Sequence, residues 1–514
     1  MFTKYVNEPF TDFGVEENRR KMEEAIAQVK KELGQEYPLY IGDEEIMTEA
    51  KITSVNPSQT SQVVGYTAKA DKKLAEQAMD EAVKAFETWK DVPAEERARY
   101  LVKAAALMRR RKFEFSAWLV MEIGKSWVEA DADVAEAIDF MEYYARQMVE
   151  LDKQLNLTDF PGEESWSRYI PLGVGAIIPP WNFPVAILIG MTTGAIVAGN
   201  TVVLKPASNT PVVAAKFVEL LREISLPPGV VNLVPGGGGE IGDFLVDNPR
   251  TRFINFTGSK EVGLRIVERA AKAQPGQKWI KRVHAEMGGK DTLIIDNDCD
   301  LEEAARVTVA SAYGFQGQKC SACSRVVVHK DVYDQFLELL VPLVEKIKPG
   351  DVTKGDYLGP VCDAKAHKSI LNYIDIGKKE GRLLVGGNAG PEEGWFVEPT
   401  VIADIDPMAT ISQEEIFGPV LAVIKANDFE HALEIANNTE FGLTGGVFSN
   451  NRENLELARQ KFHVGNLYFN RKITGALVGV QPFGGFNMSG TCAKAGGPDY
   501  LLLFTQLKIV VEKY

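Results

Sequence analysis

The alternation of short apolar runs with helix-like segments between residues 174 and 234 constrains the possible fold more than any other feature. Runs rich in Val, Ile and Leu at 174–178, 201–205 and 230–234 have the length of buried strands, and helical apolar spacing separates them. Because strands that alternate with helices pair in parallel, the pattern predicts an α/β fold with a parallel sheet. A second alternating region extends from 286 to about 470. A chain of 514 residues is too long for one ordinary core, so we expect roughly two to four domains.

The charge and cysteine content argue against several classes of protein. The chain has 57 basic and 71 acidic residues, a net charge of −14, which disfavours nucleic acid and anionic membrane surfaces as partners. Five cysteines, at positions 299, 320, 323, 362 and 492, are too few for a disulfide framework, and the N-terminus has no secretory signal. We therefore expect a cytoplasmic protein. None of the five histidines shows metal-ligand spacing, so no metal site is expected.

The uncharged stretch from 169 to 204 is the segment that most resembles a membrane span. Its apolar part begins at Phe183, but Pro184, Gly190 and Gly194 interrupt it. We therefore expect a buried helix followed by a strand, and no membrane association.

The polar, glycine-containing loop at 314–325 has the composition of a reactive-cysteine loop. Cys320 is flanked by Lys319 and Arg325, whose positive charges can favour the thiolate that acts as a nucleophile. The alternative for this loop by itself is a structural cysteine buried in a turn.

Two upstream segments add complementary chemistry. Glu286 precedes the glycine pair Gly288-Gly289, so its carboxylate can lean into a cavity as a base. Asn182 lies among prolines and aromatics at 179–184, which can fix its amide as a hydrogen-bond donor in a dry site. Together with Cys320 they supply a nucleophile, a base and an oxyanion donor.

These segments resemble the aldehyde dehydrogenase superfamily. Six motifs follow the family's order: Pro180-Trp181-Asn182-Phe183-Pro184, Lys205-Pro206-Ala207-Ser208, Phe256-Thr257-Gly258-Ser259, Glu286-Met287-Gly288-Gly289-Lys290, Gly317-Gln318-Lys319-Cys320 and Glu415-Ile416-Phe417-Gly418-Pro419. The resemblance implies a Rossmann-type cofactor domain (1–154 and 171–285) and an α/β catalytic domain (286–488). It also implies a small β oligomerisation element, a hairpin at 155–170 with a C-terminal strand in 489–514. We therefore expect a homo-oligomer, either a dimer or an assembly of dimers.

The resemblance implies NAD as the cofactor. The residues that match the family's cofactor contacts are Ile178, Pro180, Trp181, Lys205, Ser208, Gly258, Ser259, Glu415 and Phe417. Gly258 and Ser259 follow an expected strand and precede an expected helix, where backbone N–H groups suit a diphosphate. Ser208 stands where strictly NAD-preferring members often have Glu, so NADP stays open. Residues 237–242 also fit the pattern G-x-G-x-x-G, which a run of glycines meets easily.

The reaction implied by the resemblance is the oxidation of an aldehyde through a cysteine thioester. Cys320 attacks the aldehyde, the Asn182 amide and the Cys320 N–H hold the alkoxide, and Glu286 activates the water that hydrolyses the thioester.

The loop at 474–485, together with Lys319-Cys320-Ser321, resembles the subfamily of 1-pyrroline-5-carboxylate dehydrogenases, which oxidise L-glutamate γ-semialdehyde to glutamate. The residues that match its substrate contacts are Glu136, Phe183, Ser321, Gly475, Ala476 and Phe483. Gly475, Ala476 and Ser321 would hold the α-carboxylate, Glu136 would face the α-ammonium, and the two phenylalanines would enclose the aliphatic chain. Two alternatives stay open: another semialdehyde or broad aliphatic aldehyde, and a non-catalytic binding protein that retains the fold.

Cys323 forms a C-x-x-C pattern with Cys320. The simpler interpretation is a small packing residue behind the nucleophile. The alternative is a protective disulfide under oxidation, which requires the two Cα atoms to lie within about 7 Å.

Overall fold

The N-terminal half of the chain is built around a seven-stranded sheet, and the computed structural model describes residues 3–155, 157–491 and 494–514. The strands run in the order β11 (Arg282–Glu286), β10 (Thr251–Thr257), β7 (Val174–Ile178), β8 (Thr201–Leu204), β9 (Val231–Leu233), β2 (Leu39–Ile41) and β3 (Glu44–Ile46). The first five are parallel, and β2 and β3 add an antiparallel edge. The predicted α/β fold with a parallel sheet is confirmed.

Helices cover both faces of this sheet because successive strand residues point to opposite sides. On one face, Ala176 and Val203 pack in a core with α2 (Lys72–Trp89), α8 (Asp243–Asp247) and α9 (Lys260–Ala271). On the other face, Ile177 and Val202 pack in a core formed by α1 (Glu16–Glu32), α3 (Ala94–Arg110), α4 (Lys112–Ile123), α5 (Trp127–Leu151), α6 (Ala186–Val197) and α7 (Pro211–Glu223). Helix α6 is the apolar segment of the uncharged stretch, and it is buried in protein. No described helix is long and apolar enough to cross a membrane.

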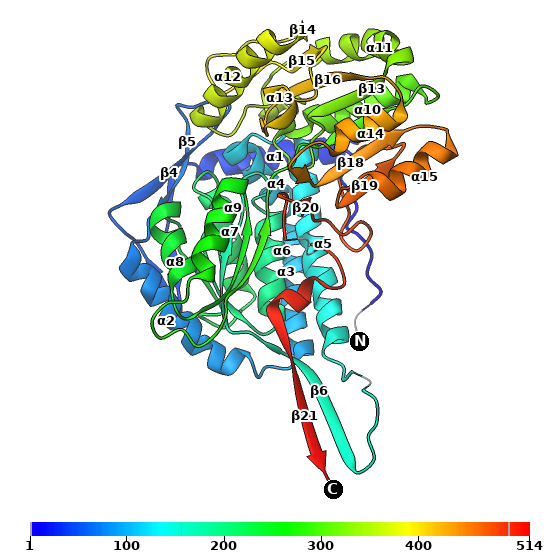
Figure 1. Cartoon of the computed structure of the whole chain (residues 1–514). Coiled ribbons are helices and arrows are strands. Elements are labelled where there is room, and N and C mark those ends of the chain that lie inside the picture. The colour runs from blue at the N-terminus through cyan, green and yellow to red at the C-terminus, as the bar shows by residue number, and fades with distance from the viewer. Residues whose placement is uncertain (1–2, 156, 492–493) are drawn as a thin grey trace.

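The C-terminal half contains a second seven-stranded sheet, which lies above the first in Figure 1. Its order is β14 (Arg382–Val385), β15 (Thr400–Ala403), β16 (Val420–Ala426), β13 (Arg325–His329), β12 (Thr292–Ile295), β18 (Thr444–Phe448) and β19 (Asn466–Phe469). All pairs are parallel except β14 with β15. One face packs against α10 (Leu301–Tyr313) and α11 (Tyr333–Glu345), and the other against α12 (Ala364–Glu380), α13 (Thr410–Gln413), α14 (Phe429–Asn437) and α15 (Arg452–Lys461).

A two-stranded ribbon projects from the body, made of β6 (Glu163–Pro171) and β21 (Thr505–Lys513) (Figure 1). The structure corrects the expected hairpin at 155–170. Among the described residues of that segment, only Phe160 and Glu163 pair with each other. The partner of β6 is the remote C-terminal strand β21, antiparallel from Thr505 opposite Pro171 to Lys513 opposite Glu163. The remaining small sheets are β1 (Gln35–Tyr37) with β5 (Val63–Ala68) and β4 (Lys51–Val55), and β17 (Phe441–Gly442) with β20 (Phe486–Asn487).

Candidate active site

The nucleophile loop connects α10 to β13 through an unusual backbone turn. Phe315, Gln316 and Gly317 are consecutive left-handed residues, with φ of 49°, 57° and 68°. Left-handed conformations are unfavourable for the first two because of their Cβ atoms, so surrounding contacts must hold them. The Gln316 side-chain Nε2 donates to the carbonyls of Gly124 (3.1 Å) and Pro360 (2.7 Å). The loop that carries Cys320 is therefore fixed from two remote segments.

The candidate oxyanion donor is fastened to the same loop. Asn182 follows β7, is buried, and its Nδ2 donates to the Gln318 carbonyl at 3.0 Å. Gln318 precedes Cys320 by two residues, and Asn182 and Cys320 line the same cleft. The structure thus brings together these two predicted residues, and the amide has a second proton that this bond does not use.

Glu286 ends β11 and is buried at the other side of Cys320. Both residues line one pocket. Among the described residues, no hydrogen bond of ordinary geometry reaches either carboxylate oxygen. Burial raises the pKa of Glu286 well above its usual value, while the nearby Gly485 N–H and the Lys494 charge act in the opposite direction. A buried, poorly satisfied carboxylate beside a nucleophile is the environment expected of a general base.

The environment of Cys320 differs from the sequence-based expectation. Burial, followed by the nearby carboxylates of Asp291 and Glu286, raises the pKa of the thiol. The prediction that Lys319 and Arg325 favour the thiolate of Cys320 is wrong, because both positive charges are bound to other groups. Lys319 Nζ binds Glu129 Oε1 at 2.6 Å, and the buried Arg325 guanidinium donates to Thr292 Oγ1 and to the carbonyls of Ile435 and Ala436. Burial and the neighbouring carboxylates therefore favour the thiol form of Cys320 over the thiolate.

Cys323 lies in the hydrophobic core behind this loop. It is 1% exposed, and its Sγ–H donates to the Arg325 carbonyl at 3.2 Å. Both Cys320 and Cys323 are free thiols. This placement agrees with a packing role, and the oxidative disulfide stays a prediction. Cys492 lies outside the described residues.

A long cleft of about 660 Å³ opens on one side of Cys320. Eight of the nine predicted cofactor residues line it: Ile178, Pro180, Trp181, Lys205, Gly258, Ser259, Glu415 and Phe417. Ser208 does not appear in its described lining and lies exposed in the turn after β8. Three glycines of the 237–242 segment also border the cleft, namely Gly238, Gly239 and Gly242.

The chemistry of this cleft fits a dinucleotide. Trp181 and Phe417 offer aromatic surface, with ring centroids 5.5 Å apart. Lys205 is buried, its Nζ contacts only the Pro206 carbonyl in the described hydrogen bonds, and burial lowers its pKa to about 8. Ser259 caps the N-terminus of α9, which suits an anionic group. The cleft therefore offers an ammonium group and a helix N-terminus for the anionic part of a dinucleotide, and apolar surface for its two nucleosides.

Glu415 explains the glycine pair after Glu286. A Cβ at position 288 would lie 2.2 Å from Glu415 Oε2, so Gly288 admits the carboxylate directly against the backbone. The Gly289 N–H then donates to Glu415 Oε1 at 3.1 Å. Burial raises the pKa of Glu415, and this hydrogen bond and the charge of Lys290 partly offset that effect.

A smaller pocket of about 70 Å³ opens on the opposite side of Cys320. Of the predicted substrate residues, Glu136, Ala476 and Phe483 line it. Phe183, Ser321 and Gly475 do not appear in its described lining. Their places are different: Phe183 stacks against the Lys125 ammonium at 3.8 Å, Ser321 is buried, and Gly475 adjoins Ala476.

Sequence reasoning missed the aromatic wall of this pocket. Tyr144 of α5 stacks on Tyr500 with ring centroids 5.1 Å apart, and Phe140, His284 and Gln481 complete the wall. The sequence signal was an aromatic stripe on α5, which resembles an ordinary core pattern. The described residues contain no group of three or more His, Cys, Asp or Glu arranged for a metal ion.

The fold and this two-sided site define an oxidoreductase class: the chain belongs to the aldehyde dehydrogenase family, whose model matches residues 45–510. Two curated relatives have the same more specific name. The 1-pyrroline-5-carboxylate dehydrogenases of Geobacillus thermodenitrificans and Anoxybacillus flavithermus are 60% and 61% identical over 100% of both chains. A solved structure of 1-pyrroline-5-carboxylate dehydrogenase from Thermus with bound NAD superimposes with a TM-score of 0.99, at 55% identity and full coverage of both chains. The predicted resemblance to the family and to this subfamily is confirmed.

Proposed function

We propose that this protein oxidises L-glutamate γ-semialdehyde, formed from 1-pyrroline-5-carboxylate, to L-glutamate with NAD as the cofactor, a step of proline and arginine catabolism. The observation that carries the proposal is the convergence on Cys320 of two cavities, a cleft suited to a dinucleotide and a pocket lined by Glu286, Glu136 and Ala476. The full-length relatives of the same specific name support it.

The catalytic sequence follows from the three central residues. After losing its proton, Cys320 attacks the aldehyde carbon, and the Asn182 amide and the Cys320 N–H stabilise the alkoxide that forms. NAD, when bound in the cleft, supplies the acceptor for the hydride that leaves this carbon, so that a thioester remains on Cys320. Glu286 then removes a proton from the water that attacks the thioester, which releases the acid and the cysteine.

The cofactor contacts divide along the cleft. Lys205 would hold the adenosine ribose, Gly258 and Ser259 the diphosphate, and Glu415 with Phe417 the nicotinamide ribose. Ser208, which lies outside the described lining of the cleft, would reach the adenosine ribose from the turn after β8. The small, exposed Ser208 leaves room for a 2′-phosphate, so NADP is a second possible cofactor.

The substrate contacts follow the polarity of the semialdehyde. Glu136 faces the α-ammonium, and the backbone N–H groups of Gly475 and Ala476, with Ser321, bind the α-carboxylate. Phe183 and Phe483 enclose the aliphatic chain. Burial, followed by the nearby Asp133 charge, raises the pKa of Glu136 to about 8, so a cationic partner would favour its ionised form.

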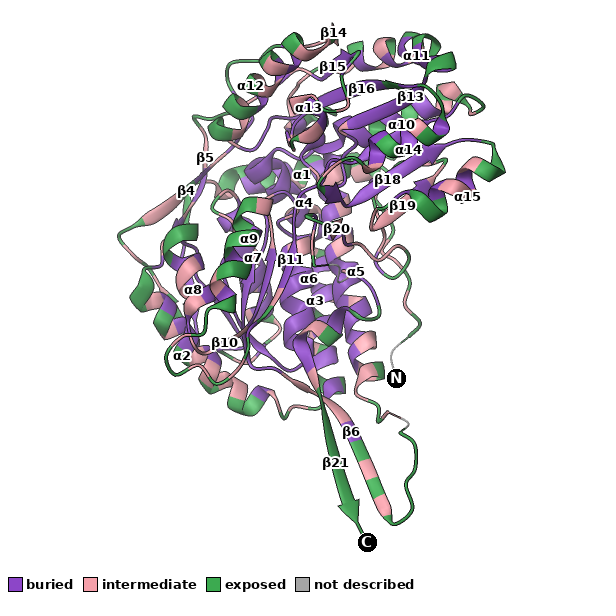
Figure 2. Ribbon diagram, in the orientation of Figure 1, coloured by how far each residue is buried: buried purple, intermediate pink, exposed green. Residues whose placement is uncertain are grey.

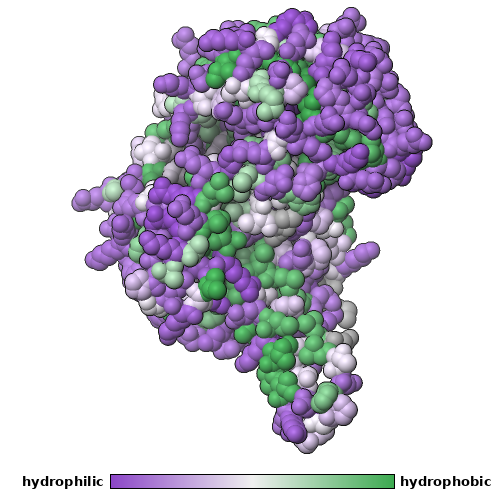
Figure 3. Space-filling model, in the orientation of Figure 1, coloured by the Kyte–Doolittle hydropathy of each residue, from purple (hydrophilic) through white to green (hydrophobic). Residues whose placement is uncertain are grey.

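The assembly rests on the projecting ribbon. Apolar side chains of β21 are exposed, with Ile509 at 47% and Val511 at 52%, and green patches lie beside paler and purple ones on the ribbon in Figure 3. Figure 2 shows β21 almost entirely exposed. An exposed apolar strand edge requires a partner in water. We infer a cytoplasmic homo-oligomer, either a dimer or an assembly of dimers, in which residues 155–170 and 489–514 form the contacts between subunits. The cofactor domain comprises residues 1–154 and 171–285, and the catalytic domain comprises residues 286–488.

Cofactor reduction with 1-pyrroline-5-carboxylate tests the proposal. Wild type should reduce NAD with this substrate far more efficiently than with aliphatic aldehydes that lack the α-amino acid group. Cys320→Ala should bind NAD but show no turnover. Equal activity across the aldehyde panel would contradict the proposed substrate, and turnover by Cys320→Ala would contradict the nucleophile.

A further inference from the structure

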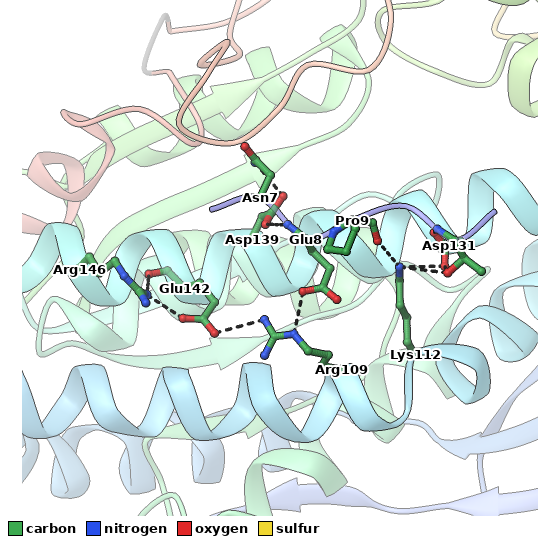
Figure 4. Close-up of polar contacts among 10 residues, drawn as sticks. Asn7, Glu8, Pro9, Arg109, Lys112, Asp131, Asp139, Glu142 and Arg146 are labelled. Atoms are coloured by element: carbon green, nitrogen blue, oxygen red, sulfur yellow. Dashed lines mark hydrogen bonds and ion pairs between the residues drawn. The ribbon is translucent and has the colours of Figure 1, made fainter. Parts of the chain in front are cut away.

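The first described residues form an N-terminal arm, residues 3–14, that contains no helix or strand and lies along α5 (Figure 4). Side chains of the body hold it at several points. Arg146 Nε donates to the Thr3 carbonyl (2.8 Å), Arg109 pairs with Glu8 (2.7 Å), and Lys112 Nζ donates to the Pro9 carbonyl (2.8 Å). Val6 and Phe10 are exposed, whereas Tyr5 and Phe13 pack against the core, so polar contacts and these two rings together fix the arm's path.

The Asp139 carboxylate and the Val478 carbonyl receive hydrogen bonds from Tyr5, Asn7 and Glu8 of the arm. Asn7 Nδ2 donates to Asp139 Oδ2 at 2.9 Å and to the Val478 carbonyl at 3.0 Å, and it also lies 2.8 Å from the Tyr5 hydroxyl, so the two protons of its amide are shared among three acceptors. The Tyr5 hydroxyl donates to the same Val478 carbonyl at 3.1 Å. The second oxygen of Asp139 accepts the Glu8 N–H at 2.7 Å. The arm therefore provides partners for both carboxylate oxygens and for one loop carbonyl.

That carbonyl belongs to the anchor loop, defined here as residues 475–481. Ala476, Leu477 and Val478 line the pocket beside Cys320. Gly479 packs directly on the arm: a Cβ there would lie 2.9 Å from the Tyr143 ring and 3.2 Å from the Tyr5 ring. The arm thus supports the outer side of a loop whose inner side forms the pocket wall.

The arm also supports the opposite wall. Asp139 lies one turn after Glu136 on α5, so the two share a face of the helix. Glu136 lines the pocket, whereas Asp139 binds the arm. Tyr5 packs edge-on against Tyr143 of the same helix, with ring centroids 5.2 Å apart. One short segment therefore connects the helix of Glu136 to the anchor loop.

We propose that the N-terminal arm is a specificity element that positions the anchor loop and the Glu136 side of α5 for the amino acid end of the substrate, with Tyr5 and Asn7 as positioning residues. The proposal rests on the proposed function. The family model begins at residue 45, so the arm precedes the matched region, and relatives of the same specific name align over the whole chain.

The double variant Tyr5→Phe/Asn7→Ala tests the proposal, because it removes both donors to the Val478 carbonyl and leaves every pocket residue in place. Two hydrogen bonds of ordinary strength correspond to a loss of about 5- to 150-fold. We expect KM for 1-pyrroline-5-carboxylate to rise by this factor. KM for propanal and the Kd of NAD should stay within about twofold, since neither engages the amino acid end.

Asn18→Ala is the matched control. Asn18 Nδ2 donates to the Asp12 carbonyl at 2.9 Å, so the variant loosens the arm at its exposed end and leaves the anchor loop untouched. It should behave as wild type with both aldehydes. Amide hydrogen exchange of residues 475–481 provides a second measurement, which should become faster in the double variant and not in the control.

The outcomes separate the two proposals. If wild type shows no preference for 1-pyrroline-5-carboxylate, the proposed function fails and the inference fails with it. If wild type prefers this substrate but the double variant has the wild-type KM and the wild-type rate of amide hydrogen exchange in residues 475–481, the arm has no positioning role. An equal rise in KM for both aldehydes would indicate general structural damage and would also overturn the inference.

Discussion

Replacing Gly288 by Ala perturbs one cofactor contact without touching the nucleophile. The added methyl carbon would lie 2.2 Å from Oε2 and 2.4 Å from Cδ of Glu415, against ordinary contacts that begin near 3.4 Å. The carboxylate must therefore move by about 1 Å, which breaks its 3.1 Å hydrogen bond from the Gly289 N–H. A hydrogen bond that involves a charged group contributes about 1.5–3 kcal/mol. If the displaced Glu415 loses its contact with the cofactor ribose, we expect the Kd of NAD to rise about 10- to 100-fold.

Titration of NAD against the protein's tryptophan fluorescence measures this change, because Trp181 lines the same cleft. Gly239→Ala is the matched control: Gly239 also borders the cleft, but an added Cβ there meets no atom within 4 Å. The alkylation rate of Cys320 by iodoacetamide reports separately on the nucleophile loop and should change by less than twofold.

Two results would refute this reasoning. A Kd for Gly288→Ala within twofold of wild type would show that Glu415 does not contact the cofactor. An equal loss of NAD affinity in Gly288→Ala and Gly239→Ala would show that any added carbon in the cleft weakens NAD binding, whether or not it displaces the Glu415 carboxylate.

Three other predictions follow from buried polar groups. Glu286→Gln should keep a pre-steady-state burst of reduced cofactor while steady turnover falls about 10²- to 10⁴-fold, and loss of the burst would place Glu286 before hydride transfer. Asn182→Ala should lower kcat/KM about 10²- to 10³-fold in steady-state assays with NAD affinity unchanged. Burial raises the pKa of Glu122 from 4.5 to about 7, so its stabilising contribution is complete below pH 4.5 and is lost as pH rises through 7. Thermal midpoints should therefore fall between pH 5 and 8 more steeply for wild type than for Glu122→Gln, and parallel curves would contradict the shift.

The sequence by itself determined the local features of the site. Val and Ile runs such as 174–178 form buried strands because their side chains suit a pleat covered on both faces, and this pattern gave the parallel sheet. The prolines and aromatics around Asn182 restrict its backbone through neighbouring residues, and the glycines after Glu286 mark a close approach whose partner, Glu415, only the fold reveals. The sequence was therefore enough to predict Cys320, Glu286 and Asn182 as candidate catalytic residues.

Only the tertiary structure decided which remote groups these residues meet. Lys319 looked like an activator of Cys320, yet its ammonium pairs with Glu129, far away in the sequence. Strand β6 looked like half of a hairpin, yet it pairs with β21. Nothing in the sequence marks the N-terminal arm as a neighbour of the pocket, yet Asn7 donates to the Val478 carbonyl. The physical reason is the same in each case: local sequence limits backbone conformation, whereas the partner of a charged, polar or strand-edge group depends on which distant segments packing brings within about 3 Å.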